Sequence, residues 1–397
     1  MTDVAARLAD LRERDLHRQL RLVEGAQGPL VRLGDREVLL LCSNNYLGLA
    51  DEPRVRTAAA AAALEWGAGS GASRLISGSM EPHRYLELEL ADFEGFPETL
   101  LFGSGYLANT GAIAALAGPG EVVFSDELNH ASIIDGCRLS RAETRVYRHR
   151  DLDHLAWSIA DADGRAALIA TDGVFSMDGD LAPVAELYEL ARRHGARLLV
   201  DEAHATGAVG PGGRGTVAAA GLSGEPDVVV VGTLGKALGA YGAYVCADHE
   251  TVDYLVNSVR PFIFSTALPP AAAAAATEAL AVLRAEPDRI EKLRRNASVL
   301  RQALASEGLA VGDSQAQILP VRIGGAEPTM RLCELLLERG VFAQGIRPPT
   351  VPEGTSRLRL TVMSTHQPPE LEAAARTIGE AARELNLATA ERVAAPR

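Results

Sequence analysis

Lysine is rare in this chain, and one of its two lysines lies where an amine could do chemistry. The 397 residues include 39 lysines and arginines together, of which only Lys236 and Lys292 are lysines. Lys292 lies in the charged segment 290–295, which is typical of an exposed helix face. Lys236 lies in the glycine-rich segment 232–239, after an apolar stretch. A lysine amine can lose its proton and an arginine guanidinium cannot, so Lys236 is a candidate for chemistry that needs a neutral amine.

Other candidate groups also follow apolar stretches. The segment Gly103-Ser104-Gly105-Tyr106 lies between a predicted strand and a predicted helix, where backbone N–H groups can bind a phosphate. Asp201, His204 and His130 each follow a predicted strand. Ligands bind at the carboxyl ends of parallel strands in open α/β sheets. A phosphate site, an acid for a ring nitrogen and an amine in this order match what pyridoxal phosphate requires.

Two other kinds of phosphate-binding motif are alternatives to this interpretation. The segment Gly103–Ala108 also matches a dinucleotide fingerprint, with Asp126 placed to bind a ribose, as in a nicotinamide-dependent dehydrogenase. That alternative leaves Asp201, His204 and Lys236 without a role. Lys236 is not a P-loop lysine, because Val230 and Ala237 stand where that motif needs glycine and a hydroxyl residue.

The predicted elements that carry these groups alternate between strand and helix. Between residues 82 and 246 the apolar stretches predict a mostly parallel sheet with helices on both faces, which is an α/β fold. The run 228–231 of four valines predicts a central buried strand. Beyond about residue 270 we expect a smaller α+β unit, with one strand spanning Val341–Ile346. The predicted domains are a helical arm and small segment (1–55), a large cofactor domain (56–284) and a small C-terminal domain (285–397).

Composition excludes several classes of function. The net charge is −13 at pH 7, so the chain lacks the general basic surface that nucleic acids require. The alanine run 271–276 is too short to span a membrane. The four cysteines are far apart and form no metal-binding spacing, and the N-terminus has no secretory apolar region. We therefore expect a cytoplasmic protein without a structural metal.

Several longer motifs resemble those of one family over nearly the whole chain. They are Ser43-Asn44-Asn45-Tyr46-Leu47-Gly48-Leu49, Ser125-Asp126-Glu127-Leu128-Asn129-His130-Ala131-Ser132, Gly173-Val174-Phe175-Ser176-Met177-Asp178-Gly179-Asp180 and Val200-Asp201-Glu202-Ala203-His204. The chain resembles the α-oxoamine synthases, which are pyridoxal-phosphate enzymes of the aspartate-aminotransferase fold type. One departure is Asp172, where relatives more often carry glutamate.

The resemblance implies roles for particular residues. Lys236 would form a Schiff base with the cofactor and later remove the α-proton of the amino acid, while His130 would stack on the cofactor ring. Asp201 would pair with the ring nitrogen, and His204 would bond the phenolic oxygen. Further cofactor contacts would come from Ser104, Gly105, Tyr106, Ser176 and Thr233. Substrate contacts would come from Arg18, Asn44, His130, Arg347 and Thr350, with Arg21 as the alternative to Arg18.

The resemblance also implies partners. The segment Ile346–Pro352 is most similar to members that join L-alanine to a pimeloyl thioester, carried by coenzyme A or acyl carrier protein, in biotin biosynthesis. Other members use glycine or serine with other acyl thioesters, so that alternative stays open, as does a chain that keeps the fold only for binding. The family is homodimeric with sites at the interface, where Ser265 and Thr266 would reach the phosphate of a neighbouring subunit.

Overall fold

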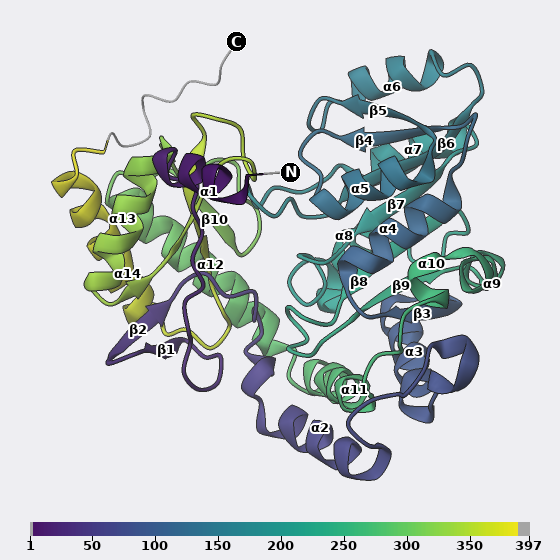
Figure 1. Cartoon of the computed structure of the whole chain (residues 1–397), viewed down its shortest axis with the longest axis horizontal. Helices are drawn as coiled ribbons and strands as arrows, with labels where there is room; N and C mark the ends of the chain where they lie inside the picture. The colour runs from purple at the N-terminus through teal and green to yellow at the C-terminus, as the bar shows by residue number, and fades with distance from the viewer. Residues whose placement is uncertain (1–2, 388–397) are drawn as a thin grey trace. The chain divides into compact units, whose positions relative to one another are not determined.

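The computed structural model describes residues 3–387, which fall into two compact units. Within the described residues, the larger unit comprises 47–176 and 180–290, and the smaller unit comprises 3–46, 177–179 and 291–387. Figure 1 labels the elements of both units.

The larger unit is built on a seven-stranded sheet with the order β3-β9-β8-β7-β6-β4-β5. Five neighbouring strands, from β8 to β5, are parallel, while β9 is antiparallel to both β8 and β3. The strands are β3 (Glu98–Phe102), β4 (Val122–Asp126), β5 (Glu143–Tyr147), β6 (Ala166–Asp172), β7 (Arg197–Asp201), β8 (Val228–Thr233) and β9 (Ala243–Ala247). The predicted mostly parallel α/β sheet is confirmed.

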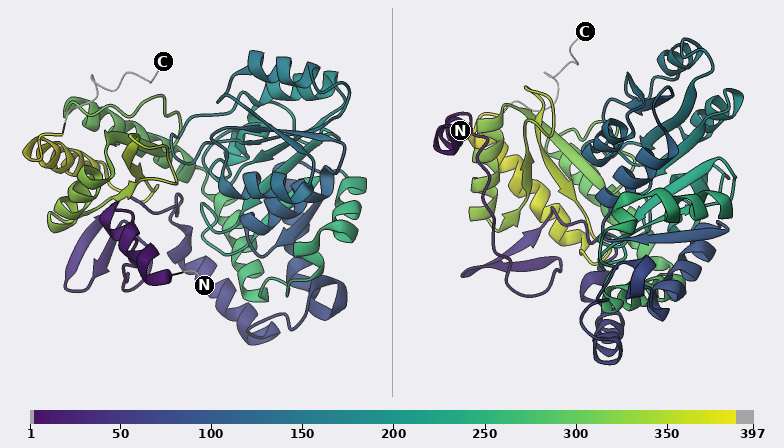
Figure 2. Two further views of the ribbon diagram at one scale, coloured as in Figure 1. Left: turned by 45° about the horizontal axis from the view of Figure 1, so that its top comes forward. Right: turned by 45° about the vertical axis from the view of Figure 1, so that its right-hand side comes forward.

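Helices lie on both faces of this sheet (Figure 2). The α-helices of the larger unit are α2 (Pro53–Trp66), α3 (Glu81–Glu94), α4 (Gly105–Leu116), α5 (Ala131–Ser140), α6 (Leu152–Ala160), α7 (Val184–Arg193), α8 (Gly215–Ala219), α9 (His249–Ser258), α10 (Arg260–Ile263) and α11 (Pro270–Ala285). Short helical turns lie at η1 (Leu49–Asp51), η2 (Arg74–Gly78) and η3 (Pro211–Gly213).

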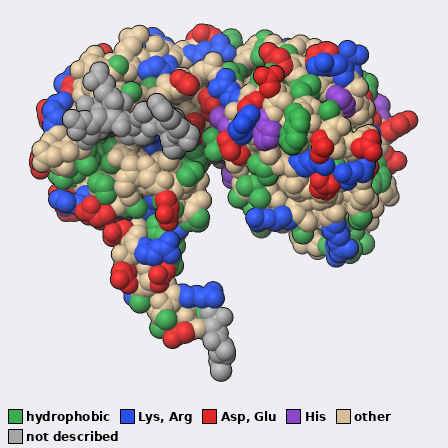
Figure 3. All heavy atoms as spheres, turned by 90° about the horizontal axis from the view of Figure 1, so that it is seen from above, with side chains coloured by type: hydrophobic (Ala, Val, Ile, Leu, Met, Phe, Trp, Pro, Cys, Tyr) green, Lys and Arg blue, Asp and Glu red, His purple; other side chains and the backbone are tan. Residues whose placement is uncertain are grey.

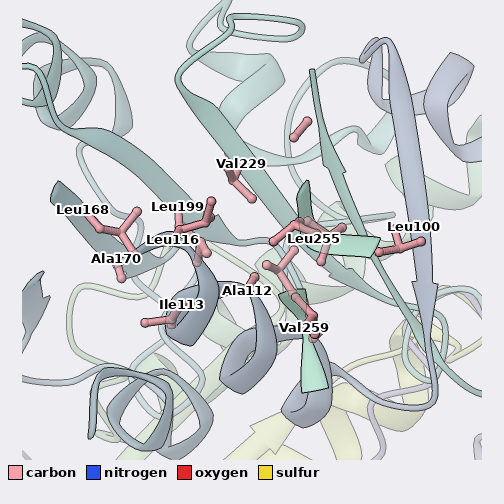
Figure 4. Close-up of a cluster of buried hydrophobic side chains, with 14 of the residues drawn as sticks. Leu100, Ala112, Ile113, Leu116, Leu168, Ala170, Leu199, Val229, Leu255 and Val259 are labelled. Atoms are coloured by element: carbon pink, nitrogen blue, oxygen red, sulfur yellow. The ribbon is translucent and has the colours of Figure 1, made fainter. Parts of the chain in front are cut away.

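The main core lies between α4, the α9–α10 segment and the sheet (Figure 4). Alanines and aliphatic residues of α4 pack on the valines and leucines of β6, β7, β8 and β9. The four valines 228–231 are between 0% and 1% exposed, so the predicted buried strand is confirmed. Because both faces of a parallel sheet are covered, most of its strands are continuous apolar runs with polar groups at their ends; the exposed edge strand β5 is the exception.

Gly232 permits the tight packing of β8 on β9, and its replacement should destabilise the fold. A Cβ atom at Gly232 would lie 2.1 Å from Cζ of Tyr244, its partner in the strand register. The Tyr244 ring is fully buried, and its hydroxyl donates to Glu94 at 2.5 Å. We expect Gly232→Ala to lower the free energy of unfolding by about 3 kcal/mol, the upper end for overpacked cores.

Denaturant unfolding of the purified chain measures this effect, with Gly118→Ala as the matched control. A Cβ atom at Gly118 would meet its nearest atom, Oε2 of Glu121, at 3.8 Å. The control should stay within about 1 kcal/mol of the parent. Equal losses for both variants would contradict the packing explanation.

The smaller unit contains two three-stranded sheets, with orders β1-β2-β11 and β10-β13-β12. Its strands are β1 (Leu30–Leu33), β2 (Arg36–Leu40), β10 (Ile318–Gly324), β11 (Val341–Phe342), β12 (Gln344–Ile346) and β13 (Ser356–Thr361). Its helices are α1 (Val4–Glu13), α13 (Ala326–Glu338), α14 (Pro368–Glu384) and most of α12 (Asp288–Ser306), whose first turn belongs to the larger unit.

Two expectations for this unit are wrong. The predicted helical arm is helical only over α1, which ends at Glu13, and residues 30–40 form the β1–β2 hairpin, turning at Gly34 with φ +64°. The strand predicted over Val341–Ile346 is two strands: β11 pairs with β2 and β12 pairs with β13. The hairpin forms because the two-residue turn Gly34-Asp35 joins β1 and β2, whereas the predicted single strand is divided by its two different distant partners.

The surface and the helices carry two further findings. None of the helices in residues 3–387 is both long and apolar enough to cross a membrane. On the face drawn in Figure 3, Lys and Arg side chains alternate with Asp and Glu side chains, so no continuous basic surface forms there.

Candidate active site

The predicted site residues of the larger unit come together at the carboxyl edge of its sheet. Strands β4, β6 and β7 end at Asp126, Asp172 and Asp201, and β8 ends at Thr233. Each strand passes directly into a loop, and these loops carry His130, His204 and Lys236. The topology therefore explains why polar groups scattered over a hundred residues become neighbours.

Lys236 and His204 are in direct contact. The distance between Nζ of Lys236 and Nε2 of His204 is 2.8 Å. His204 is buried and Lys236 is half-buried. The Lys236 loop is fixed by Gly239, whose N–H donates to the Lys236 carbonyl oxygen at 3.0 Å and whose φ is +61°. The only lysine of the larger unit is therefore held beside a second nitrogen base.

Asp201 is held from two sides by neutral donors. Nδ2 of Asn109 donates to its Oδ2 at 2.5 Å, and the N–H of Ala203 donates to its Oδ1 at 2.8 Å. The Asp201 side chain is buried, and a buried carboxylate is costly unless a cation completes its environment. The site thus offers a fixed negative charge to a cationic group.

Asp172 lies beside Asp201 in the register of β6 and β7. Burial raises the pKa of Asp172 well above its usual range, and the charge of Asp201 raises it further. The N–H of His130 donates to Oδ2 of Asp172 at 2.7 Å. The aspartate that departs from the family pattern therefore supports the loop of His130.

His130 is connected to Asp201 through two side chains. Its Nδ1 lies 2.8 Å from Oγ of Ser132, and that oxygen accepts a hydrogen bond from Nδ2 of Asn109 at 2.9 Å. Although the His130 ring reaches solvent, the surrounding protein lowers its pKa by desolvation; the charge of Asp201 raises it and that of Lys236 lowers it. The four residues predicted as catalytic therefore form one electrostatic cluster.

Asn109 and Ser132 were not predicted as site residues, although the sequence contains a signal for Asn109. It is an amide in the otherwise apolar helix segment 107–116, and it is buried. A buried amide requires hydrogen-bond partners, and in α4 these partners are the Asp201 carboxylate and Ser132.

The predicted phosphate site lies at the N-terminus of α4. Ser104 is the N-cap residue, and its side chain accepts from the N–H of Leu107 at 3.3 Å. Gly105 and Tyr106 begin the helix, where N–H groups lack acceptors within the helix. A Cβ atom at Gly105 would meet nothing within 4 Å, so there is open space for an anion. The Tyr106 hydroxyl donates to Asp135.

The other predicted cofactor contacts belong to the larger unit, where Thr233 ends β8 and Ser176 follows β6. The Thr233 hydroxyl donates to the carbonyl oxygen of Gly242 at 3.1 Å, and Ser176 is buried in the hairpin after β6. Ser265 is half-buried, and Thr266 pairs with Ser73 in an isolated bridge.

Apart from His130, the predicted substrate residues belong to the smaller unit, where a groove of about 650 Å³ contains most of them. Arg18, Arg21, Arg347 and Thr350 line the groove. Asn44 is not among the lining residues; its Oδ1 accepts from the Tyr46 hydroxyl at 3.0 Å. Arg18 and Arg21 both line the groove, so the geometry does not separate these two alternatives.

Arg347 is buried in this groove with one donor unused. Its Nη2 donates to the carbonyl oxygen of His17 at 2.6 Å, and its Nη1 lies 2.8 Å from the sulfur of Met330. Among the described residues, none accepts a hydrogen bond from its Nε. Desolvation and the charge of Arg18 both lower the pKa of Arg347. Two neighbouring guanidinium groups and an unused donor favour an anionic ligand.

The residues of the larger unit fit pyridoxal phosphate. The buried Asp201 carboxylate has only neutral donors and would be completed by a protonated ring nitrogen. The N-terminus of α4 suits a phosphate, and Lys236, whose charge acts on His130 and Asp172, supplies an amine. Asp126, which a dinucleotide would need for its ribose, is instead bonded to His149 and Arg150.

The region 3–387 contains no group of three His, Cys, Asp or Glu side chains placed to hold a metal ion.

Comparisons with known proteins agree with this fit. The model of the aminotransferase class I and II family matches residues 36–378. The chain is 49% identical over 390 residues to the 8-amino-7-oxononanoate synthase of Citrifermentans bemidjiense, covering 98% of this chain and 100% of that one. It is 51% identical over 387 residues to the same-named enzyme of Geobacter sulfurreducens, covering 97% and 99%.

Solved structures give the same result. A serine palmitoyltransferase of S. paucimobilis with bound PLP matches with a TM-score of 0.91 and 32% identity, covering 96% of this chain and 97% of that one. An 8-amino-7-oxononanoate synthase of Francisella tularensis matches with a TM-score of 0.76 and 28% identity, covering 88% and 99%. With the family model and relatives near half identity spanning almost all of its length, the chain belongs to the aminotransferase class I and II family and, within it, to the α-oxoamine synthases.

Proposed function

We propose that this chain catalyses the decarboxylative condensation of L-alanine with a pimeloyl thioester, a step of biotin biosynthesis, with pyridoxal phosphate as its cofactor. The observation that carries the chemistry is the 2.8 Å contact between Lys236 and His204 beside the buried Asp201. The choice of substrates is supported by relatives named 8-amino-7-oxononanoate synthase at 49% and 51% identity.

The chain's own residues divide the work as follows. Bound pyridoxal phosphate supplies an aldehyde for an amine and a protonated ring that withdraws electrons from the α-carbon of the amino acid. The Asp201 carboxylate holds the proton at the ring nitrogen, and Asn109 and Ala203 keep that carboxylate in place. The N-terminus of α4, with Ser104, Gly105 and Tyr106, binds the phosphate.

Lys236 moves the proton. Its amine takes the α-proton of L-alanine, and His204 at 2.8 Å fixes the position of that amine. His130 packs on the cofactor ring and is oriented by Ser132, while Thr233 and Ser176 complete the cofactor contacts. The α-carbon then attacks the thioester carbonyl, the thiol leaves, and the β-keto acid loses carbon dioxide.

Arg347 binds the substrate carboxylate. Its Nε offers a donor that none of the described residues uses, and Arg18 or Arg21 adds a second positive charge in the same groove. Asn44 and Thr350 are proposed substrate contacts in the same unit. We also propose a homodimer, in which Ser265 and Thr266 contact the phosphate of the neighbouring subunit, and a cytoplasmic location.

A panel of substrates tests the proposal. The holoenzyme is given L-alanine, glycine or L-serine with pimeloyl-CoA, pimeloyl-acyl carrier protein, acetyl-CoA, succinyl-CoA or palmitoyl-CoA, and the release of carbon dioxide and of free thiol is measured. The highest rates are expected for L-alanine with a pimeloyl thioester. The match to serine palmitoyltransferase favours one competitor, so faster release from L-serine with palmitoyl-CoA would replace the proposed substrates.

A further inference from the structure

His149 lies between two buried carboxylates of the larger unit. Its Nδ1 is 2.9 Å from Oδ1 of Asp126, and its Nε2 is 2.7 Å from Oδ2 of Asp180. The side chains of Asp126 and Asp180 are 1% and 7% exposed, and that of His149 is 20% exposed. Only a protonated imidazole can donate from both ring nitrogens at once, so with both aspartates ionised the ring carries a positive charge.

The two carboxylates that face the ring favour its positive charge, whereas the Arg150 guanidinium beside Asp180 opposes it. Desolvation lowers the pKa of His149, but hydrogen bonds to Asp126 and Asp180 and their charges raise it to about 9. Nη1 of Arg150 lies 3.2 Å from Oδ2 of Asp180, and Glu127 accepts from the backbone N–H of His149 at 2.9 Å. Among the described residues, the uncharged Phe175 ring also meets the imidazole edge to face, with 4.4 Å between the two ring centroids.

On one side, the ring is attached to the loop that carries His130. Asp126 ends β4, and its Oδ1 also accepts from the N–H of Leu128 at 2.9 Å. The Asp126 carbonyl oxygen accepts from the N–H of Asn129 at 3.2 Å. Asp126 therefore shapes the turn that places His130 one residue later.

On the other side, the ring is attached to the hairpin that carries Ser176. The carbonyl oxygen of Asp180 accepts from the N–H of Phe175 at 3.0 Å, and Val174 pairs with Leu181. Both strands of this hairpin belong to the larger unit. The two loops joined by His149 are thus the ones that carry His130 and Ser176, which we propose as cofactor contacts.

We infer that His149, Asp126 and Asp180 form a charged clamp that positions the loops of His130 and Ser176 for cofactor binding. His149 is a positioning residue here, because it acts through Asp126 and Asp180. The inference rests on the proposed pyridoxal-phosphate site of the larger unit.

The clamp predicts a definite dependence on pH. The pKa of His149 in the folded chain lies above the ordinary value of 6.5. The stabilising contribution of the protonated ring is therefore fully present below about pH 6.5 and is lost as the pH rises through about 9. Cofactor affinity should therefore weaken on the alkaline side with the same midpoint at which the ring loses its proton.

Asp180→Asn is the test variant, since the amide keeps the shape of the side chain and removes one charge. In the holoenzyme labelled at histidine, NMR should show the His149 ring titrating near pH 9, with its signal assigned by its loss in His149→Gln. We expect Asp180→Asn to lower that midpoint by about one pH unit. The apparent dissociation constant for pyridoxal phosphate should rise about tenfold as the His149 ring loses its proton. In Asp180→Asn, the pH midpoint of that rise should fall by about one pH unit, as the ring titration does.

His194→Gln is the matched control, because His194 is exposed at the end of α7; it should leave both profiles unchanged. The inference is overturned if His149 titrates near pH 6.5, or if Asp180→Asn shifts the ring titration and leaves the affinity profile in place. Wild-type protein that binds no pyridoxal phosphate at any pH would instead refute the proposed function. If His149→Gln does not fold, comparison of the parent with Asp180→Asn still decides the question.

Discussion

Lys236→Arg is expected to abolish turnover, with a fall of at least about 10⁴-fold in kcat. A guanidinium keeps a positive charge and occupies similar space, so the variant removes mainly the ability to lose a proton and to react with an aldehyde. Since Lys236 is only half-buried, the longer side chain should be accommodated without unfolding. The measurement is the release of carbon dioxide from L-alanine and pimeloyl-CoA under saturating cofactor.

Lys292→Arg is the control, because it makes the same chemical change at the only other lysine. It should retain parental kcat. In the parent, borohydride reduction of the holoenzyme followed by peptide mass spectrometry should place the cofactor on the peptide of Lys236 and leave that of Lys292 unmodified. Substantial turnover in Lys236→Arg, or a cofactor label on Lys292, would refute the assigned role of Lys236.

Asp201→Asn has the second largest expected effect, a fall of about 10²–10⁴-fold in the exchange of the L-alanine α-proton with solvent. An amide oxygen can still accept from Nδ2 of Asn109, so the local fold should survive. What is lost is the negative charge that holds a proton at the ring nitrogen. Deuterium incorporation into L-alanine, followed by NMR without an acyl donor, isolates this step.

The matched control for Asp201→Asn is Asp172→Asn at the neighbouring strand end. Burial raises the pKa of Asp172 well above its usual range, so its replacement by a neutral amide should change proton exchange much less. The thermal midpoint of Asp201→Asn should stay within a few degrees of the parent, about what 1 kcal/mol produces in a chain of this size. Equal exchange rates in parent and Asp201→Asn would mean that another group protonates the ring.

The sequence predicted most of the sheet because all its strands except the largely exposed edge strand β5 are buried on both faces. Runs such as 228–231 contain only β-branched apolar residues, and strands of this kind are recognisable without knowledge of their partners. The rarity of lysine singled out Lys236, and its position after β8 agreed with Asp201 and His204 after β7. Residues that end or follow different parallel strands could be expected to lie together, because these strands all end at the same edge of the sheet.

Other features could not be predicted because distant partners decide them. The segment Val341–Ile346 divides into two strands because β11 pairs with β2, far earlier in the chain, while β12 pairs with β13. His149 was overlooked because Asp126 and Asp180, which hold its charge, lie 23 and 31 positions away in the chain. Asn109 carried a local signal, a buried amide in an apolar helix, but its partner Asp201 is 92 positions away.

The in-register pair Asp172 and Asp201 places two acids at adjacent, buried strand ends, and the raised pKa of Asp172 leaves the pair with a single negative charge. A positively charged ring beside Asp201 would stabilise that buried charge in the folded chain. Cofactor binding and folding are therefore thermodynamically linked. Pyridoxal phosphate at 100 times its dissociation constant adds about 2.7 kcal/mol to the free energy of unfolding. The supply of pyridoxal phosphate would thus affect the stability of the folded chain as well as its catalytic activity.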